Sequence, residues 1–279
     1  MKVSYSQDEY IQNYYCRSPI FNDLKELLGV SQFSTWPDMN QLQELLPNNL
    51  CARSAKKLKF CRQDHRLPFP RMGYEERIYK TGCISTRQDN WHDYFNAMIW
   101  GLFPETKIML NELHIEEIMK NKSINHNNGR TLSRDAITHL DESGIIIAVD
   151  DWRLVEYFRT HQWKKVFYEL REIWGKQINA YVIGHGMYEK SLHPFIGMTA
   201  KMYPILMDSS FFYQHKQVQY QRLDVKLAKE VNEMQTLKNN HFLSPLPILG
   251  VPGWYEKNID ADFYDNQKYF RPPKKINTP

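Results

Sequence analysis

Hydrophobic and polar side chains recur with the period of an α-helix along DNWHDYFNAMIWGLF, residues 89–103. One face of this predicted helix carries polar residues spaced i, i+3, i+4 and i+7, namely Asp89, His92, Asp93 and Asn96. The opposite stripe is apolar and consists of Trp91, Phe95, Met98, Ile99 and Leu102. We expect Asp89 to be the N-cap. Because nearly every other side of the helix is apolar, the polar stripe predicts buried groups that need partners.

Helical patterns also cover much of the remaining chain. Residues 19–28 predict a helix with typical boundary residues: Ser18 as N-cap, Pro19 at the first helical position and Gly29 after the last turn. Further helices are predicted at residues 39–46, 105–120, 152–160, 161–177 and 218–237. Residues 47–80 are basic, contain proline and lack a clear period, so we interpret them as a surface loop.

The strand signals are fewer. Residues 136–149 predict a hairpin, because β-branched residues flank the four-residue sequence DESG, and residues 179–183 predict a buried strand. From residue 243 to residue 273 the chain is rich in proline, glycine and aromatic residues and predicts an extended tail. The fold class is therefore α+β: a single, mainly helical domain over residues 18–273 with a small antiparallel or mixed sheet. Residues 1–17 would form an N-terminal arm and residues 274–279 a short basic tail.

Composition supports a globular, cytoplasmic protein. The chain has 279 residues, of which 42% are hydrophobic and 24% charged, enough for one large core. No apolar run approaches the ~20 residues that span a bilayer, and the polar N-terminus does not resemble a signal peptide. The four cysteines show no CxxC spacing, so we expect reduced, structural thiols. They are Cys16, Cys51, Cys61 and Cys83.

A net charge of +4 raises the question of an acidic partner. Basic residues concentrate between Arg53 and Lys80, and such a patch could bind the phosphates of RNA or DNA. No zinc-finger spacing, recognition helix or RNA-binding aromatic signature accompanies it. A solvated basic face explains the same residues, so a nucleic-acid partner stays an open alternative.

The segment GHGMYEK, residues 184–190, offers a partner for the polar helix stripe. His185 and Glu189 would lie one helical turn apart, a spacing that allows both to reach one divalent ion. Imidazole and carboxylate ligands suit zinc, iron or manganese. We therefore predict His92, His185 and Glu189 as ligands of one divalent metal, with a structural polar network as the alternative.

The leading functional hypothesis is a metal-assisted hydrolase-like enzyme whose substrate is unknown. Asp93 would be a further ligand or a base, Glu142 would point a carboxylate at the site, and Asn96 with Tyr188 would orient substrate or water. No GxSxG elbow or glycine-rich phosphate loop occurs, so nucleophilic serine chemistry and nucleotide cofactors are disfavoured. The alternative function is a non-enzymatic binding or assembly protein with a basic face.

Five blocks of sequence resemble, in order and spacing, a bacterial family of uncharacterised proteins, domain of unknown function 3025. They are TRQDNWHDYFNAMIWGLFPETK, RDAITHLDESG, GHGMYEKSLHPFIGMTAK, PLPILGVPGWY and FYDNQKYFRP. The resemblance runs from about Pro19 to Pro272 and implies one family-wide domain. It implies no particular activity.

Overall fold

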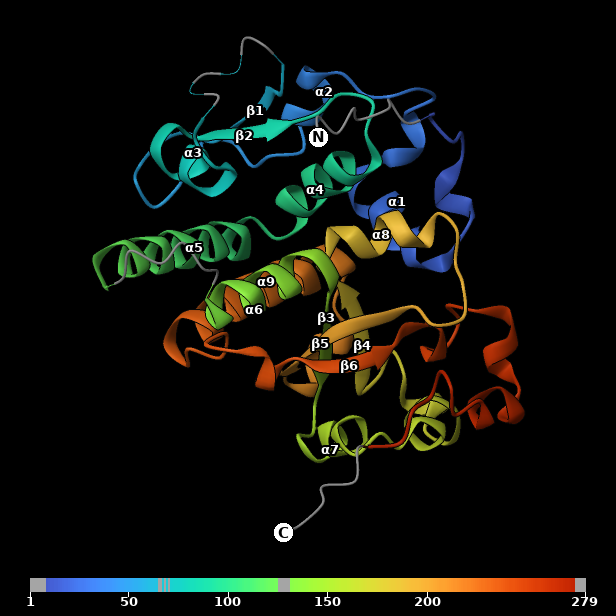
Figure 1. The fold of residues 1–279 in the computed structure, drawn as a ribbon. Helices are drawn as coiled ribbons and strands as arrows, with labels where there is room; N and C mark the ends of the chain where they lie inside the picture. The colour runs from blue at the N-terminus through green and yellow to red at the C-terminus, as the bar shows by residue number, and fades with distance from the viewer. Residues whose placement is uncertain (1–8, 65–66, 68, 70, 125–130, 274–279) are drawn as a thin grey trace.

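Helices dominate the structure, a computed structural model that describes residues 9–64, 67, 69, 71–124 and 131–273 (Figure 1). Helical residues make up 53% and strand residues 13%, which confirms the α+β prediction. No described helix is both long enough and apolar enough to cross a membrane.

The central element is a four-stranded mixed sheet in the order β4-β3-β5-β6. Its strands are β3 (Gly144–Val149), β4 (Ile178–Val182), β5 (Thr199–Leu206) and β6 (Ser244–Pro247). Strand β3 pairs antiparallel with β4 and parallel with β5, and β6 adds an antiparallel edge. Every residue of β3 is buried, as expected for a continuous apolar run covered on both faces. The tail thus supplies one strand as well as irregular chain.

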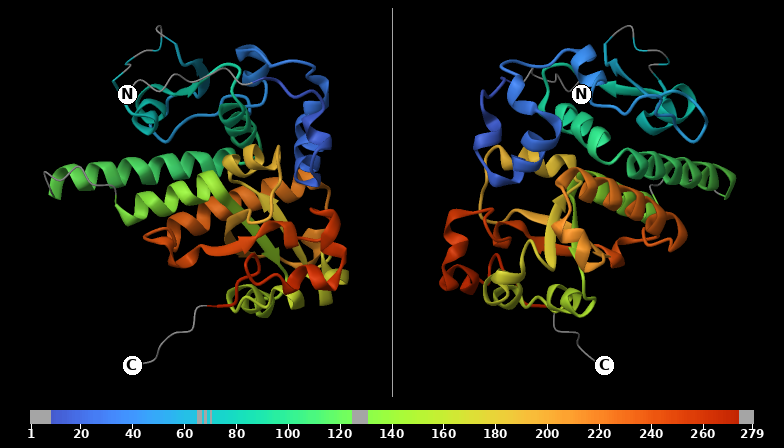
Figure 2. Two further views of the ribbon diagram at one scale, coloured as in Figure 1. Left: turned by 45° about the vertical axis from the view of Figure 1, so that its right-hand side comes forward. Right: turned by 180° about the vertical axis from the view of Figure 1, so that it is seen from behind.

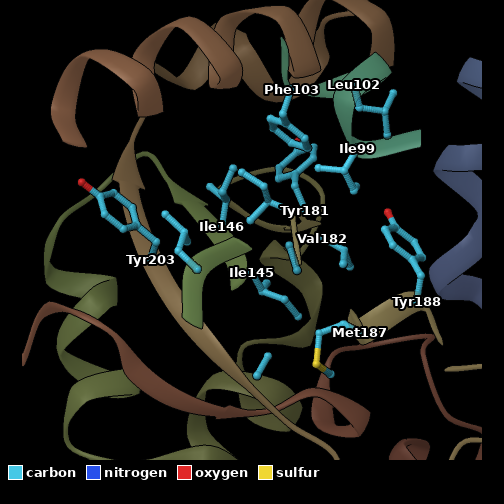
Figure 3. Close-up of a cluster of buried hydrophobic side chains, with 14 of the residues drawn as sticks. Ile99, Leu102, Phe103, Ile145, Ile146, Tyr181, Val182, Met187, Tyr188 and Tyr203 are labelled. Carbon is cyan, nitrogen blue, oxygen red and sulfur yellow. The ribbon is translucent and has the colours of Figure 1, made fainter. Parts of the chain in front are cut away.

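Helices pack around this sheet and at one of its ends. They are α4 (Trp91–Leu102), α5 (Pro104–Ile124), α6 (Leu132–Ser143), α7 (Arg153–Arg159), α8 (His185–Ser191) and α9 (Lys216–Glu233). Helix α9 covers the sheet face that carries Tyr181, whose ring lies 5.4 Å from that of Tyr220. Figure 3 shows the apolar cluster in which Ile99, Ile146 and Tyr181 meet. Helices α4, α6 and α8 pack together where β3 begins and β4 ends.

A smaller layer lies on the far side of α4 from the four-stranded sheet (Figure 2). It contains α2 (Met39–Gln43), α3 (Tyr74–Thr81), β1 (Lys59–Arg62) and β2 (Cys83–Thr86). Helix α1 (Asn22–Leu28) instead lies beside α9, where Tyr220 Oη donates to Asp23 Oδ2 at 2.7 Å. Strands β1 and β2 pair in parallel, so the prediction of a plain loop over residues 47–80 is wrong. In β1 only Phe60 is buried, and the charged residues around it hide the strand pattern.

Short helices of other types join these elements. The 3-10 helices are Tyr14–Cys16, Pro19–Phe21, Val30–Gln32, Arg171–Ile173, Ser209–Tyr213, Asn240–Phe242, Ile248–Gly250, Glu256–Ile259 and Ala261–Asp265. The predicted boundaries of the first long helical segment are confirmed: Ser18 Oγ accepts from the Ile20 amide, and Gly29 follows α1 with a φ of 59°.

The predicted hairpin at residues 136–149 is wrong in its first half. Residues up to Ser143 form α6, and only Gly144 onward forms a strand. The buried positions Ala136, Ile137 and Leu140 have helical spacing, and Thr131 caps the helix by accepting from Arg134 N. The β-branched residues in this segment therefore adopt the helix that burial demands.

The predicted helix over residues 161–177 is also wrong, because it is broken after a short π-helix at Lys165–Glu169. Leu170 N donates to Lys165 O, one residue earlier than in an α-helix. The carbonyl of Val166 accepts from the indole Nε1 of Trp174 at 2.8 Å, which folds the chain back on itself.

Two cysteines do not follow the expectation of reduced thiols. Cys61 on β1 and Cys83 on β2 form a disulfide, with Cα atoms 5.7 Å apart. Cys16 and Cys51 are free and exposed. The pair could not be anticipated, since the pairing of β1 with β2 was itself not predicted.

Candidate functional site

Three helices bring two imidazoles and a carboxylate together. His92 lies in the first turn of α4, Glu142 at the end of α6, and His185 at the start of α8. The two histidine Nε2 atoms are 3.0 Å apart. Glu142 places Oε1 3.7 Å from His92 Nε2 and Oε2 3.5 Å from His185 Nε2. We call these three residues the triad.

The start of α4 differs in detail from the prediction. The N-cap is Asn90, whose Oδ1 accepts from Asp93 N at 3.1 Å, and not Asp89. Asp89 instead adopts a left-handed conformation with a φ of 53° just before the cap. His92, Asp93 and Asn96 keep the helical spacing predicted for the polar stripe, whereas Asp89 lies outside the helix.

Glycines at the start of α8 allow the triad to form. A Cβ on Gly184 would lie 2.4 Å from Gly144 N, and a Cβ on Gly186 would lie 2.8 Å from Glu142 O. Real Cβ atoms do not approach backbone atoms this closely, so only glycine permits α8 to begin against the end of α6. The sequence GHG therefore positions His185 beside Glu142.

The spacing of the triad atoms suits a single metal ion. One ligand atom from each residue lies within 4.8 Å of the other two, in the only such group of three or more among the described residues. Ligands about 2.0–2.2 Å from a tetrahedral ion lie roughly 3.3–3.6 Å from one another. The two Nε2 atoms are 3.0 Å apart, and each lies within 3.7 Å of one of the two Glu142 oxygens, a different oxygen in each case. The donor set, two imidazoles and a carboxylate, also fits zinc or iron.

Glu189 lies beside the triad and contacts the other nitrogen of His92. His92 Nδ1 is 2.9 Å from Glu189 Oε2, and this hydrogen bond raises the pKa of His92 against the opposing effect of burial. A carboxylate that holds Nδ1–H leaves Nε2 free to bind an ion. Glu142, and not the predicted Glu189, thus belongs to the group of three residues that could hold an ion, while Glu189 hydrogen-bonds to the other nitrogen of His92.

Asp93 is committed to an ion pair next to the triad. Its Oδ2 accepts from Arg87 N at 2.6 Å and from Arg87 Nε at 3.0 Å, and its Oδ1 lies 2.7 Å from the terminal nitrogen of Arg87. This bidentate geometry satisfies both carboxylate oxygens. Asp93 therefore lines the site without joining the ligand atoms.

Asn96 belongs to a buried network that includes a lysine. Lys107 Nζ donates to Asn96 Oδ1 at 2.9 Å and forms an ion pair with Asp141, while Asn96 Nδ2 donates to Tyr74 Oη at 2.9 Å. Burial acts to raise the pKa of Asp141, but the charge of Lys107 holds it below its usual value. The side chain of Lys107 is only 4% exposed, so its charge must be compensated within the protein.

These groups surround a cavity of about 300 Å³. Its described lining residues are Gln63, Tyr74, Glu75, Ser85, Arg87, His92, Asp93, Asn96, His114, Thr138, Asp141, Glu142 and His185. A larger hollow of about 1380 Å³ beside α2 and β1 has only Glu44, Lys57 and Lys59 as ionisable lining residues. The concentration of ionisable groups identifies the smaller cavity as the candidate site.

Tyr188 does not line this cavity. Tyr188 belongs to the buried cluster of Figure 3. Its ring stacks 5.9 Å from the ring of Phe21 and 5.7 Å from that of Phe95. Its position gives no support to the prediction that it orients substrate. The sequence interpretation missed two residues of the cavity. Glu75 lies in the segment that was interpreted as a loop, and His114 lies in a predicted helix to which no functional residue was assigned.

Comparison with known proteins identifies the family and nothing beyond it. No curated protein and no solved structure matches the chain. The model of one family, described as a protein of unknown function, matches residues 58–274, a segment that contains the whole triad and its cavity. The chain therefore belongs to this family, DUF3025, as its sequence blocks indicated.

Proposed function

We propose that the protein is a hydrolase that uses one divalent metal ion held by His92, Glu142 and His185. The observation that carries this proposal is the convergence of two Nε2 atoms and a carboxylate from three separate helices. Catalytic zinc sites have three protein ligands of this kind and leave a fourth position for water. When bound, the ion supplies Lewis acidity and lowers the pKa of that water.

The protein's own groups have distinct parts in this scheme. Glu189 orients His92 through Nδ1, and the His185 side chain, only 4% exposed, is fixed by packing at the start of α8. Burial acts to raise the pKa of Glu142, but the hydrogen bond with His185 keeps it below its usual value. Glu142 is thus a carboxylate at neutral pH, the form that binds metal.

The alternative of a binding protein with a basic face has less support. Arg53 lies 3.2 Å from Glu112, and Lys80 lies 3.6 Å from Glu76. Arg77 is buried and donates to Ser85 Oγ at 2.6 Å. Part of the basic segment therefore has structural partners, while nucleic-acid binding and a cytoplasmic location remain predictions from the sequence.

The test is metal binding by protein purified without a histidine tag. We expect one zinc, manganese or iron ion per chain in the wild type, and its loss in His185→Ala and Glu142→Gln. The matched control is His139→Ala, on the same helix as Glu142, because His139 hydrogen-bonds to Asn240 away from the triad. An ion at 100 times its Kd adds ~2.7 kcal/mol to the unfolding free energy. Equal metal content and equal thermal response in wild type and His185→Ala would refute the proposal.

A further inference from the structure

We propose that the site acts on the uncharged carbonyl group of a small polar amide or ester, and that Glu75 is the catalytic carboxyl that carries the proton. This inference rests on the proposed function and assigns its substrate class. Three features of the cavity support it: the pairing of its cations, its neutral hydrogen-bonding groups and the surroundings of Glu75.

The permanent cations at the cavity are already neutralised. Arg87 is the only lysine or arginine among the described lining residues, and it pairs bidentately with Asp93. Lys107 reaches the same wall and pairs with Asp141. An anionic substrate group would have to displace one of these carboxylates or approach it closely, at a cost in like-charge repulsion. Apart from the ion held by the triad, the described cavity walls therefore offer a phosphate or carboxylate group no second permanent positive charge that is not already paired.

The neutral lining groups suit an uncharged polar ligand. The cavity presents the side chains of Gln63, Tyr74, Ser85, Asn96 and Thr138. A volume of about 300 Å³ is at the small end of ligand-binding sites, so the molecule, or the part of it that enters, must be small. Hydrogen-bonding groups of both donor and acceptor type match amides and esters.

Glu75 enters the same cavity from α3 and has no contact with the triad. Asn111 Nδ2 donates to Glu75 Oε2 at 2.7 Å, and His114 Nε2 lies 4.0 Å from Oε1. The Glu75 side chain is 23% exposed. Burial raises the pKa of Glu75 to about 7. The charge of Asp141 raises this pKa further, whereas the Asn111 hydrogen bond and the charges of Lys107 and Arg134 lower it. A carboxyl of this kind can accept and return a proton near neutrality.

The proposed reaction uses these groups in two steps. A water molecule gives one proton to the Glu75 carboxylate while its oxygen bonds to the carbonyl carbon and the π pair of the C=O bond moves onto the carbonyl oxygen. The C=O bond then re-forms as the bond to the departing nitrogen or oxygen breaks, and the protonated Glu75 gives its proton to that departing atom. One water is consumed, the carboxylate is regenerated and no electrons are transferred to another molecule. The scheme requires no co-reactant.

The test compares two probes on zinc-loaded protein by isothermal titration calorimetry. Acetamide is uncharged and carries the proposed carbonyl group, whereas inorganic phosphate is an anion. We expect acetamide to bind at least about tenfold more tightly than phosphate to the wild type. Equal or tighter phosphate binding overturns the inference, and this comparison needs no variant.

A second arm tests Glu75 itself. Glu75→Gln should weaken acetamide binding about tenfold and remove its pH dependence near pH 7. The matched control Glu76→Gln alters the neighbouring glutamate, which pairs with Lys122 at 3.1 Å, and should change neither. Zinc content is measured on every sample. Loss of zinc from the wild type overturns the proposed function as well, whereas normal zinc with unchanged probe binding in Glu75→Gln overturns only this inference.

Discussion

Substituting Gly186 with alanine should weaken metal binding while leaving the protein folded. The added Cβ would meet Glu142 O at 2.8 Å and Glu142 Oε2 at 3.1 Å. To reach ordinary contact, Glu142 must move by about half an ångström, which is as much as a precise site tolerates. Alanine gains up to ~1 kcal/mol of helix propensity over glycine, and overpacking costs ~1–3 kcal/mol. We therefore expect a loss of at most about 2 kcal/mol of unfolding free energy in metal-free protein.

The effect on the metal should be larger than the effect on the fold. Displacing Glu142 should raise the zinc Kd by about 10–100-fold, measured by competition with a chromogenic chelator. The matched control is Gly101→Ala, because a Cβ there would also lie 2.8 Å from a backbone oxygen, that of Leu45, yet away from the triad. Gly101→Ala should lose similar stability and keep wild-type zinc affinity. Wild-type affinity in folded Gly186→Ala would show that the Glu142 position does not control the ion.

Three further substitutions test the rest of the structure. Lys107→Met should lower the unfolding free energy measured in urea by ~3–5 kcal/mol, because it leaves the buried Asp141 without a cation. Adding Asp141→Asn should restore part of that stability. An unchanged unfolding free energy in Lys107→Met alone would contradict the network. Burial raises the pKa of Asp224 to about 6, above its usual 3.8, so its stabilising contribution is full below about pH 4 and is lost as pH rises through 6. Relative to Asp224→Asn, the wild type should lose about 2 kcal/mol of unfolding free energy between pH 4 and pH 7, and a constant difference would refute this. Asn258→Ala should lower the unfolding free energy by ~2–3 kcal/mol, since the buried amide donates to the carbonyls of Leu249 and Val251; an unchanged melting temperature would count against it.

The central part of the site could be predicted from local spacing, and its outer part could not. The helical period of the segment around His92 and the GHG sequence around His185 are visible in the sequence, and the structure brings both histidines together. Glu142 was predicted to point into the site from a hairpin turn, but it does so from a helix end. The exchange of roles between Glu142 and Glu189 depends on which rotamer reaches which ring nitrogen, and spacing carries no such information.

Glu75 and Lys107 illustrate the limit on sequence-based prediction most clearly. Glu75 follows a basic, proline-containing stretch, and its helix is packed against α5 by contacts that span more than thirty residues, such as that of Asn111 with Glu75. Lys107 lies in a helix with an ordinary mixture of charged and apolar residues. Nothing local distinguishes its ammonium from a solvated one, because its burial arises only when α4 and α6 close over it.

The origin of the triad in three different helices sets the order of events during maturation. His92 and His185 are separated by 93 positions, with Glu142 between them on a third helix, so a growing chain holds no preformed ligand set. An ion would therefore enter only after α4, α6 and α8 have packed, and its release would require only the short helix α8 to move away. Metal selection would then occur at the finished protein, by the width of the gap between three helices, and not during synthesis.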